Sequence, residues 1–153
     1  MKKGHMYLVM EKKPQMSYGC FTSLIQKGVT GLCISRQHPK SIYERYPMAD
    51  THILWLTTAM GENYVNPTNI GILTNFAVNF MQSNLDNSTV LIDGIEYLTV
   101  YNEFSSVLKS VYYINEVAMK NGVIVIIPVA PQAFTDKNLA LLEREAEVAR
   151  PNH

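Results

Sequence analysis

The sequence predicts an α/β protein of three layers, in which helices cover both faces of a five-stranded, mainly parallel sheet. Short runs of apolar and β-branched residues alternate five times with segments of helical periodicity, as in open parallel sheets. Residues 123–129 are almost entirely hydrophobic, which is typical of central strands buried on both faces. With 153 residues, 47% of them hydrophobic, the chain can build one core, and we expect a single domain over residues 3–149.

Each predicted strand is a short apolar run that leads into a polar residue, a glycine or a proline. The five runs are residues 6–10, 31–35, 52–56, 89–93 and 123–129. The segment between the third and fourth runs, residues 61–66, is predicted to be a loop.

Each predicted helix has apolar residues spaced three and four apart, between a capping residue and a glycine or proline. Ser17 is a candidate cap for the first helix, Asn66 for the long helix that starts at Pro67, and Asn102 for the next. The helices are expected at residues 15–27, 40–45, 67–83 and 103–121, with a last helix after Thr135 that places Ala146 inward.

Charge and composition exclude several classes of partner. Thirteen basic residues balance thirteen acidic ones, so no field of one sign predicts binding to nucleic acid or to an anionic membrane. No apolar run approaches the ~18 residues of a membrane span. The two cysteines fall in helical and strand patterns as small hydrophobic residues, and we expect a cytoplasmic protein.

The fourth strand ends at Asp93, and Glu96 follows three residues later. An acid at the end of a buried strand holds Mg²⁺ in nucleotide-hydrolysing proteins, and a following acid can orient the attacking water. The same spacing also fits a capping box, in which Asp93 caps a helix and Glu96 reaches back to it. The capping interpretation is favoured over a metal site.

The segment after the first strand argues against nucleotide hydrolysis. Residues 10–17 contain no glycine, and Glu11 stands where a phosphate would lie. Pro14 removes a donor N–H, and no Gly-Lys-Ser/Thr occurs in the chain. No nucleophile elbow, dinucleotide fingerprint or metal-ligand cluster is present either. We therefore predict no catalytic residue, metal or cofactor, and we expect a protein that is not an enzyme.

Five polar residues follow strands and are predicted to share the carboxyl edge of the sheet, where ligands bind in such folds. These candidate ligand-binding residues are Glu11, Arg36, Thr57, Asp93 and Glu96. For Arg36, an ion pair with Glu11 or Asp93 is favoured over a catalytic role.

Several short segments together resemble one family. The first two segments are Gly4, residues 7–9 and Glu11, and then residues 31–34, Arg36 and Pro39. The others are residues 55–57, residues 93–98, and the pair Asn102 and Phe104. The chain resembles the archaeal family called domain of unknown function 835. This resemblance implies an archaeal source and a regulatory role, and it supplies no catalytic residues.

More distantly, the order of elements resembles a RecA/KaiC-type core that lacks its phosphate loop. This resemblance implies the strand order 3-2-4-5-1, with the first strand at an edge. An uncovered edge invites pairing, so the expected protein partners include a second copy in a homodimer.

The sequence thus predicts a non-enzymatic regulatory or protein-interaction domain. The alternative is a sensor that binds a nucleotide or another small ligand at the carboxyl edge. A third hypothesis is a metal-dependent enzyme, in which Asp93 and Glu96 converge on open space.

Overall fold

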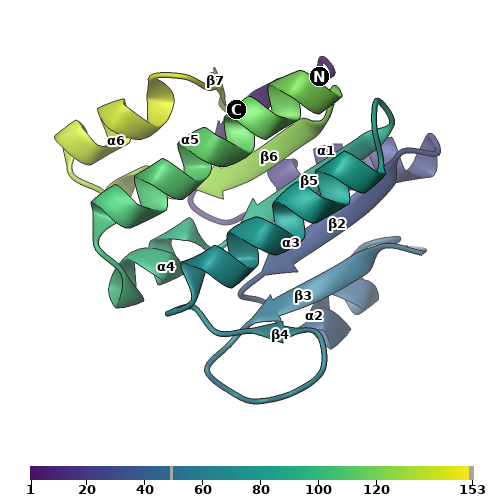
Figure 1. Cartoon of the computed structure of the whole chain (residues 1–153), viewed down its shortest axis with the longest axis horizontal. Coiled ribbons are helices and arrows are strands. Elements are labelled where there is room, and N and C mark those ends of the chain that lie inside the picture. The colour runs from purple at the N-terminus through teal and green to yellow at the C-terminus, as the bar shows by residue number, and fades with distance from the viewer. Residues whose placement is uncertain (49, 152–153) are drawn as a thin grey trace.

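The structure is a computed structural model and describes residues 1–48 and 50–151 (Figure 1). The described strands form one parallel sheet in the order β4-β3-β2-β5-β6-β1-β7. Their bounds are β1 Met6–Met10, β2 Thr30–Ser35, β3 His52–Leu56, β4 Tyr64–Val65, β5 Ser88–Asp93, β6 Ile124–Val129 and β7 Glu147–Ala149. The prediction of five strands is therefore wrong in number, because the sheet formed by the described residues has seven.

The two unexpected strands lie at the two edges of the sheet. β4 falls in the predicted loop and pairs two residues with Trp55 and Leu56 of β3. The last helix was expected to include Ala146, but α6 ends at Glu143, and β7 begins directly after Ala146. Strands of two and three residues are too short to show an alternating pattern in the sequence.

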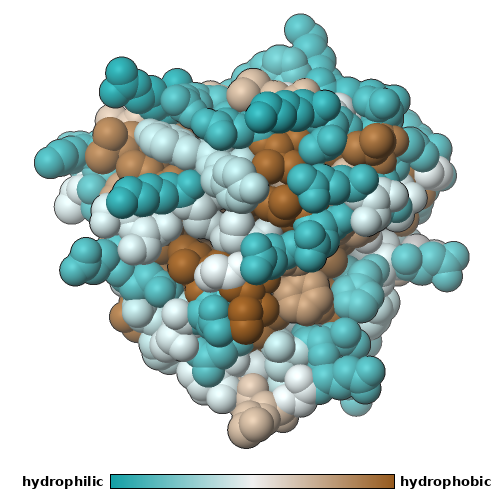
Figure 2. All heavy atoms as spheres, viewed as in Figure 1, coloured by the Kyte–Doolittle hydropathy of each residue, from teal (hydrophilic) through white to brown (hydrophobic). Residues whose placement is uncertain are grey.

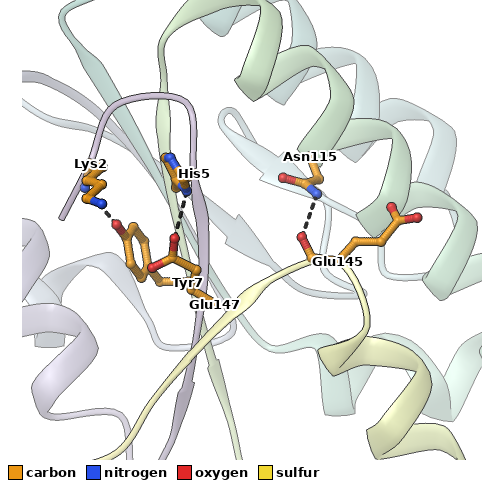
Figure 3. A network of polar contacts seen from close by, with 6 residues as sticks. All are labelled: Lys2, His5, Tyr7, Asn115, Glu145 and Glu147. Atoms are coloured by element: carbon orange, nitrogen blue, oxygen red, sulfur yellow. Dashed lines mark hydrogen bonds and ion pairs between the residues drawn. The ribbon is translucent and has the colours of Figure 1, made fainter.

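The five expected strands follow the expected order, but the prediction that the first strand is an edge is wrong. β7 covers it, pairing Tyr7, Leu8 and Val9 with residues 147–149. Figure 3 shows how the segment around β7 is held: His5 contacts the Glu147 carboxylate at 2.8 Å, and Asn115 donates to the Glu145 carbonyl. Because β1 is covered, an exposed β1 edge no longer supports the expected homodimer, which stays a prediction.

The predicted helices are present close to their expected positions, but several of their predicted capping residues are wrong. The bounds are α1 Met16–Gln26, α2 Pro39–Arg45, α3 Ile70–Ser83, α4 Ile95–Tyr101, α5 Phe104–Asn121 and α6 Asp136–Glu143, with a short 3-10 turn at Pro131–Ala133. Thr135 caps α6 as expected. Asn69 rather than Asn66 caps α3, and Asn102 ends α4 instead of starting α5. Ser17 lies inside α1, and its buried hydroxyl has no partner among the described residues.

The three expected layers are present. α3, α4, α5 and α6 cover one face of the sheet (Figure 1). The core on this face includes Leu73 and Val111 from the helices and Leu8 and Val90 from the strands. α1 and α2 cover the other face, where Phe21 and Ile42 pack with Leu91 and other strand residues (Figure 1). Successive strand residues point to opposite faces, so both cores draw on the same strands. Within the described part of the chain, no helix combines the length and the apolar character needed to cross a membrane.

Candidate functional site

A pocket of about 960 Å³ opens at the carboxyl edge of the sheet. The segments after β1, β2, β5 and β6 line it, together with the end of α2. This is the edge at which open α/β sheets bind ligands. Four of the five predicted site residues lie in its lining: Glu11, Arg36, Asp93 and Glu96.

Thr57 is the predicted residue that the structure places elsewhere. It does not line the pocket, and its hydroxyl accepts a hydrogen bond from the backbone N–H of Ala59. It follows β3, which lies one strand further from the centre of the sheet than β2. The structure therefore brings four of the five residues together in one pocket, and their role in ligand binding stays a prediction.

Glu11 follows β1 and turns its carboxylate onto the start of α1. One oxygen accepts the backbone N–H groups of Gln15 at 3.0 Å and Met16 at 2.8 Å, and the other accepts that of Ser17 at 2.9 Å. The first N–H groups of a helix have no intrahelical acceptor, and the helix dipole favours an anion beside them. Glu11 therefore serves as the cap of α1, which has no capping side chain at Gln15.

Asp93 is the last residue of β5 and is paired in register with Ser35 of β2. Its Oδ2 accepts hydrogen bonds from Tyr18 at 2.7 Å, Gln37 at 3.0 Å and Ser35 at 3.1 Å. The side chain is 9% exposed. Asp93 therefore does not cap a helix, and the capping interpretation is wrong: Gly94 precedes α4 and no side chain caps it.

The Tyr18 hydroxyl is a permanent donor in this network. Burial in the core raises the pKa of Tyr18 far above its ordinary value, and the neighbouring Cys33 and Asp93 raise it further. Because the hydroxyl keeps its proton, it can always donate to the Asp93 carboxylate. Tyr18 itself is fixed by stacking on Tyr46, with the ring centroids 4.9 Å apart.

Glu96 lies in the first turn of α4 and reaches across to the segment after β6. Its Oε1 accepts the backbone N–H of Ala130 at 2.7 Å. Burial raises the pKa of Glu96, Asp93 adds to this effect, and the Ala130 hydrogen bond and Arg36 oppose it. Because Asp93 and Glu96 are both engaged by protein donors, they do not converge on open space as the metal-enzyme hypothesis predicted. Across residues 1–48 and 50–151, no group of three or more His, Cys, Asp or Glu is arranged to hold a metal.

Arg36 projects from the end of β2 without forming the predicted ion pair. Neither Glu11 nor Asp93 contacts its guanidinium, which instead lies over the ring of Tyr97 at 4.4 Å from the centroid. The backbone N–H of Arg36 donates to the backbone carbonyl of Asp93 at 3.0 Å, and the backbone carbonyl of Arg36 accepts the indole N–H of Trp55 at 2.9 Å. Its backbone is therefore held on both sides.

Gly94 makes the close approach of Arg36 possible. Its φ is +134°, a conformation that side chains disfavour. A Cβ at this position would also lie 3.3 Å from both Arg36 Cβ and Leu56 Cδ1. Glycine is therefore required by conformation as well as by space.

Tyr18, Ser35 and Gln37 are not among the site residues predicted from the sequence. Two signals for them are present in the chain: Tyr18 stands three residues before Phe21 on the face that α1 buries, and Ser35 ends the strand beside β5. Gln37 carries no such signal, because it lies in an irregular segment after β2.

Comparisons with known proteins agree on family and fold. Residues 10–146 match the family described as "Protein of unknown function (DUF835)". No curated protein matches the sequence. The structure is similar to a KaiC-like protein from the hyperthermophilic archaeon Pyrococcus horikoshii, with a TM-score of 0.68 and 11% identity over 99% of this chain and 74% of that one. It is also similar to the flagellar accessory protein FlaH from Methanocaldococcus jannaschii, with a TM-score of 0.64 and 12% identity over 98% and 72%.

Identities this low establish a shared fold, whereas the family match extends over most of the sequence. The chain accordingly belongs to the DUF835 family of proteins of unknown function, built on a RecA/KaiC-like α/β fold.

Proposed function

We propose that this chain is a non-enzymatic regulatory or protein-interaction domain in which a side chain of the protein fills the position of a bound phosphate. The observation that carries the proposal is the Glu11 carboxylate, which accepts three backbone N–H groups at the start of α1. In nucleotide-hydrolysing proteins of related architecture, a glycine-rich loop before this helix presents such groups to the phosphates.

A nucleotide phosphate would have to displace Glu11 to reach the same amides. Two anions sharing one helix terminus repel each other, and Glu11 is covalently part of the loop, which makes it the favoured occupant. The loop offers a phosphate few other backbone donors, because Lys12, Lys13 and Pro14 stand in place of the usual glycines and Pro14 has no N–H to donate. These features support a domain that has kept the fold without the hydrolytic site.

The acid that would hold Mg²⁺ in a hydrolytic site, Asp93, is also committed to protein contacts. Asp93 stands at the end of β5, and three side-chain donors occupy its Oδ2. Binding Mg²⁺ through this oxygen would break hydrogen bonds that are mostly buried, at a cost of about 1–3 kcal/mol for each donor left unpaired.

The outer surface of α3 and α5, called here the α3–α5 face, carries exposed hydrophobic side chains that support a role in protein interaction. Ile72 and Phe76 of α3 leave 45% and 44% of their surface exposed, and Tyr113 of α5 leaves 48%. On this face, small hydrophobic groups lie between hydrophilic residues (Figure 2). Exposed aromatic and aliphatic residues suit protein interfaces, and a second copy of the chain is one such partner.

Nucleotide turnover tests the non-enzymatic proposal. Purified protein is incubated with Mg·ATP, and orthophosphate release is measured for the wild type and for Asp93→Asn. We expect both proteins to match the background without protein. Turnover by the wild type that Asp93→Asn abolishes would defeat the proposal, because it would require Asp93 to act on bound nucleotide.

A ligand-binding sensor is the second candidate function, favoured by the charge of the pocket. Four basic side chains line it, from Lys12, Lys13, Arg36 and Arg45, and none forms an ion pair with a described acid. A ligand that binds only the folded protein raises its melting temperature. Thermal titration with nucleotides therefore tests this candidate, and the absence of any rise at millimolar ligand would argue against nucleotide sensing.

A further inference from the structure

We propose that Arg36 is the anion-binding residue of the carboxyl-edge pocket and that the pocket takes a small phosphate ester, held by side-chain cations rather than by the start of α1. This inference rests on the ligand-sensing candidate and names the chemical class of its ligand. Its starting point is that Arg36 is positioned from several sides, yet its guanidinium donates to no described residue.

The positioning of Arg36 begins at its backbone. Its N–H is held by the Asp93 carbonyl and its carbonyl by the Trp55 indole. Trp55 is in turn packed edge-on against Tyr64 and His38, with ring centroids 4.9 and 4.6 Å away. These contacts fix the point of the pocket rim from which the Arg36 side chain projects.

Tyr97 provides the second support. The guanidinium lies over its ring, and Tyr101 packs edge-on against that ring with a centroid distance of 5.2 Å. The guanidinium carbon lies 4.4 Å from the centre of this ring, and the guanidinium N–H groups donate to no described residue. Those donors match the paired oxygens of a phosphate or carboxylate.

The acids near Arg36 do not use these donors. Glu11 faces the amides of α1, Asp93 faces Tyr18, Ser35 and Gln37, and Glu96 faces Ala130. The remaining charges that line the pocket are Lys12, Lys13 and Arg45, all exposed and none paired with a described acid. The pocket thus turns its acids toward protein donors while its cations remain available.

Charge and size together indicate the ligand class. Four cations suit a ligand with more than one negative charge, which phosphate esters and diphosphates carry at neutral pH. A volume of about 960 Å³ lies at the upper end of the range for small-molecule sites, so it has room for an organic group beside the phosphate. Tyr46 and Tyr97 provide aromatic surface for that group.

Titration with inorganic pyrophosphate tests the inference, because this probe carries the charge without an organic group. Binding is measured by calorimetry at constant ionic strength for the wild type, Arg36→Gln, Arg36→Lys and the control Arg144→Gln. Arg144 is exposed at the end of α6 and does not line the pocket. We expect Arg36→Gln to weaken binding about ten- to a hundredfold, Arg36→Lys to be intermediate, and Arg144→Gln to match the wild type.

Three results would overturn the inference: no binding of pyrophosphate by the wild type at millimolar concentration, equal binding by Arg36→Gln, or equal binding by Arg36→Lys. Circular dichroism and the melting temperature without ligand check that each variant is folded. A parallel titration with ATP shows whether a base and ribose add affinity to the shared phosphate chemistry.

The same samples separate this inference from the proposed function. Orthophosphate released from bound pyrophosphate would defeat the non-enzymatic proposal and leave the Arg36 site standing. Equal binding by Arg36→Gln would remove the Arg36 site while a ligand-sensing role remained.

Discussion

Three carboxylates reach the carboxyl edge of the sheet, and at the scale of single residues each meets different donors. Glu11 accepts backbone amides of α1, Asp93 accepts side-chain donors from α1 and from the end of β2, and Glu96 accepts the amide of Ala130. Asp93 and Glu96 therefore join segments that are distant in the sequence, whereas Glu11 joins the end of β1 to the start of the next helix, α1. Their role at this edge is to position the structure around the pocket.

Glu96 should make the stability of the protein depend on pH. Because burial raises its pKa in the folded state, the folded protein holds this proton up to a higher pH than the unfolded chain, where the value is about 4.3. The contribution of Glu96 to stability is then full below the unfolded pKa and is lost as the pH rises through the folded pKa. We expect Glu96→Gln, which can still accept the Ala130 N–H, to be free of this loss.

Urea unfolding of both proteins at several pH values between about 4 and 8 measures the effect. The free energy of unfolding of Glu96→Gln should gain on that of the wild type as the pH rises from the lower limit. A constant difference between the two proteins over the whole range would show that the Glu96 pKa is not raised.

Residue types at the edge were predictable from the sequence, but their partners were not. Asp93 and Glu96 have the spacing of a capping box, yet β5 continues through Asp93 because its partner strand continues to Ser35. The helix starts only after Gly94, which puts Asp93 one residue too early to cap it. Strand register decides this point, and it depends on residues more than fifty positions apart.

At the scale of elements, α1 depends on a residue outside itself. Replacing Glu11 with alanine should destabilise the protein by about 1–2 kcal/mol, the usual cost of losing a helix cap, because three backbone N–H groups lose their acceptor. The free energy of unfolding in urea measures this change.

Glu62→Ala is the matched control, since Glu62 is an exposed acid in the β3–β4 connection. It should change stability by no more than about 0.5 kcal/mol. If Glu11→Ala and Glu62→Ala were equally stable, the carboxylate would not be capping α1.

Long elements were predictable because their patterns repeat, and short ones were not. The apolar faces of α3 and α5 and the five central strands follow from spacing alone. β4 and β7 are defined by pairing with a neighbour rather than by any pattern of their own. Asn102 is a suitable residue for either end of a helix, and only the structure assigns it to the end of α4.

At the scale of the whole molecule, β7 determines whether β1 is exposed. A chain that ends at Ala146 would lose the three residue pairs that cover β1, together with the contact between His5 and Glu147. We expect this shortened chain to self-associate more strongly than the full chain, because an exposed strand edge pairs with other chains. Light scattering at matched concentrations measures the difference.

If the shortened chain kept the mass of the full chain at every concentration, β7 would not be protecting an edge. Strand order was predictable through the resemblance to a RecA/KaiC-type core, whereas the cover on β1 was not, because β7 lies outside the five strands of that resemblance.

Amide hydrogen exchange at the start of α1 tests the central claim most directly, namely that Glu11 occupies the position of a phosphate. First-turn amides of a helix normally exchange fast because they have no intrahelical acceptor. We expect the amides of Gln15, Met16 and Ser17 to be protected in the wild type and to lose that protection in Glu11→Ala, while Phe21 and Thr22 in the middle of α1 stay protected in both. Fast exchange of the three first-turn amides in the wild type would contradict the claim.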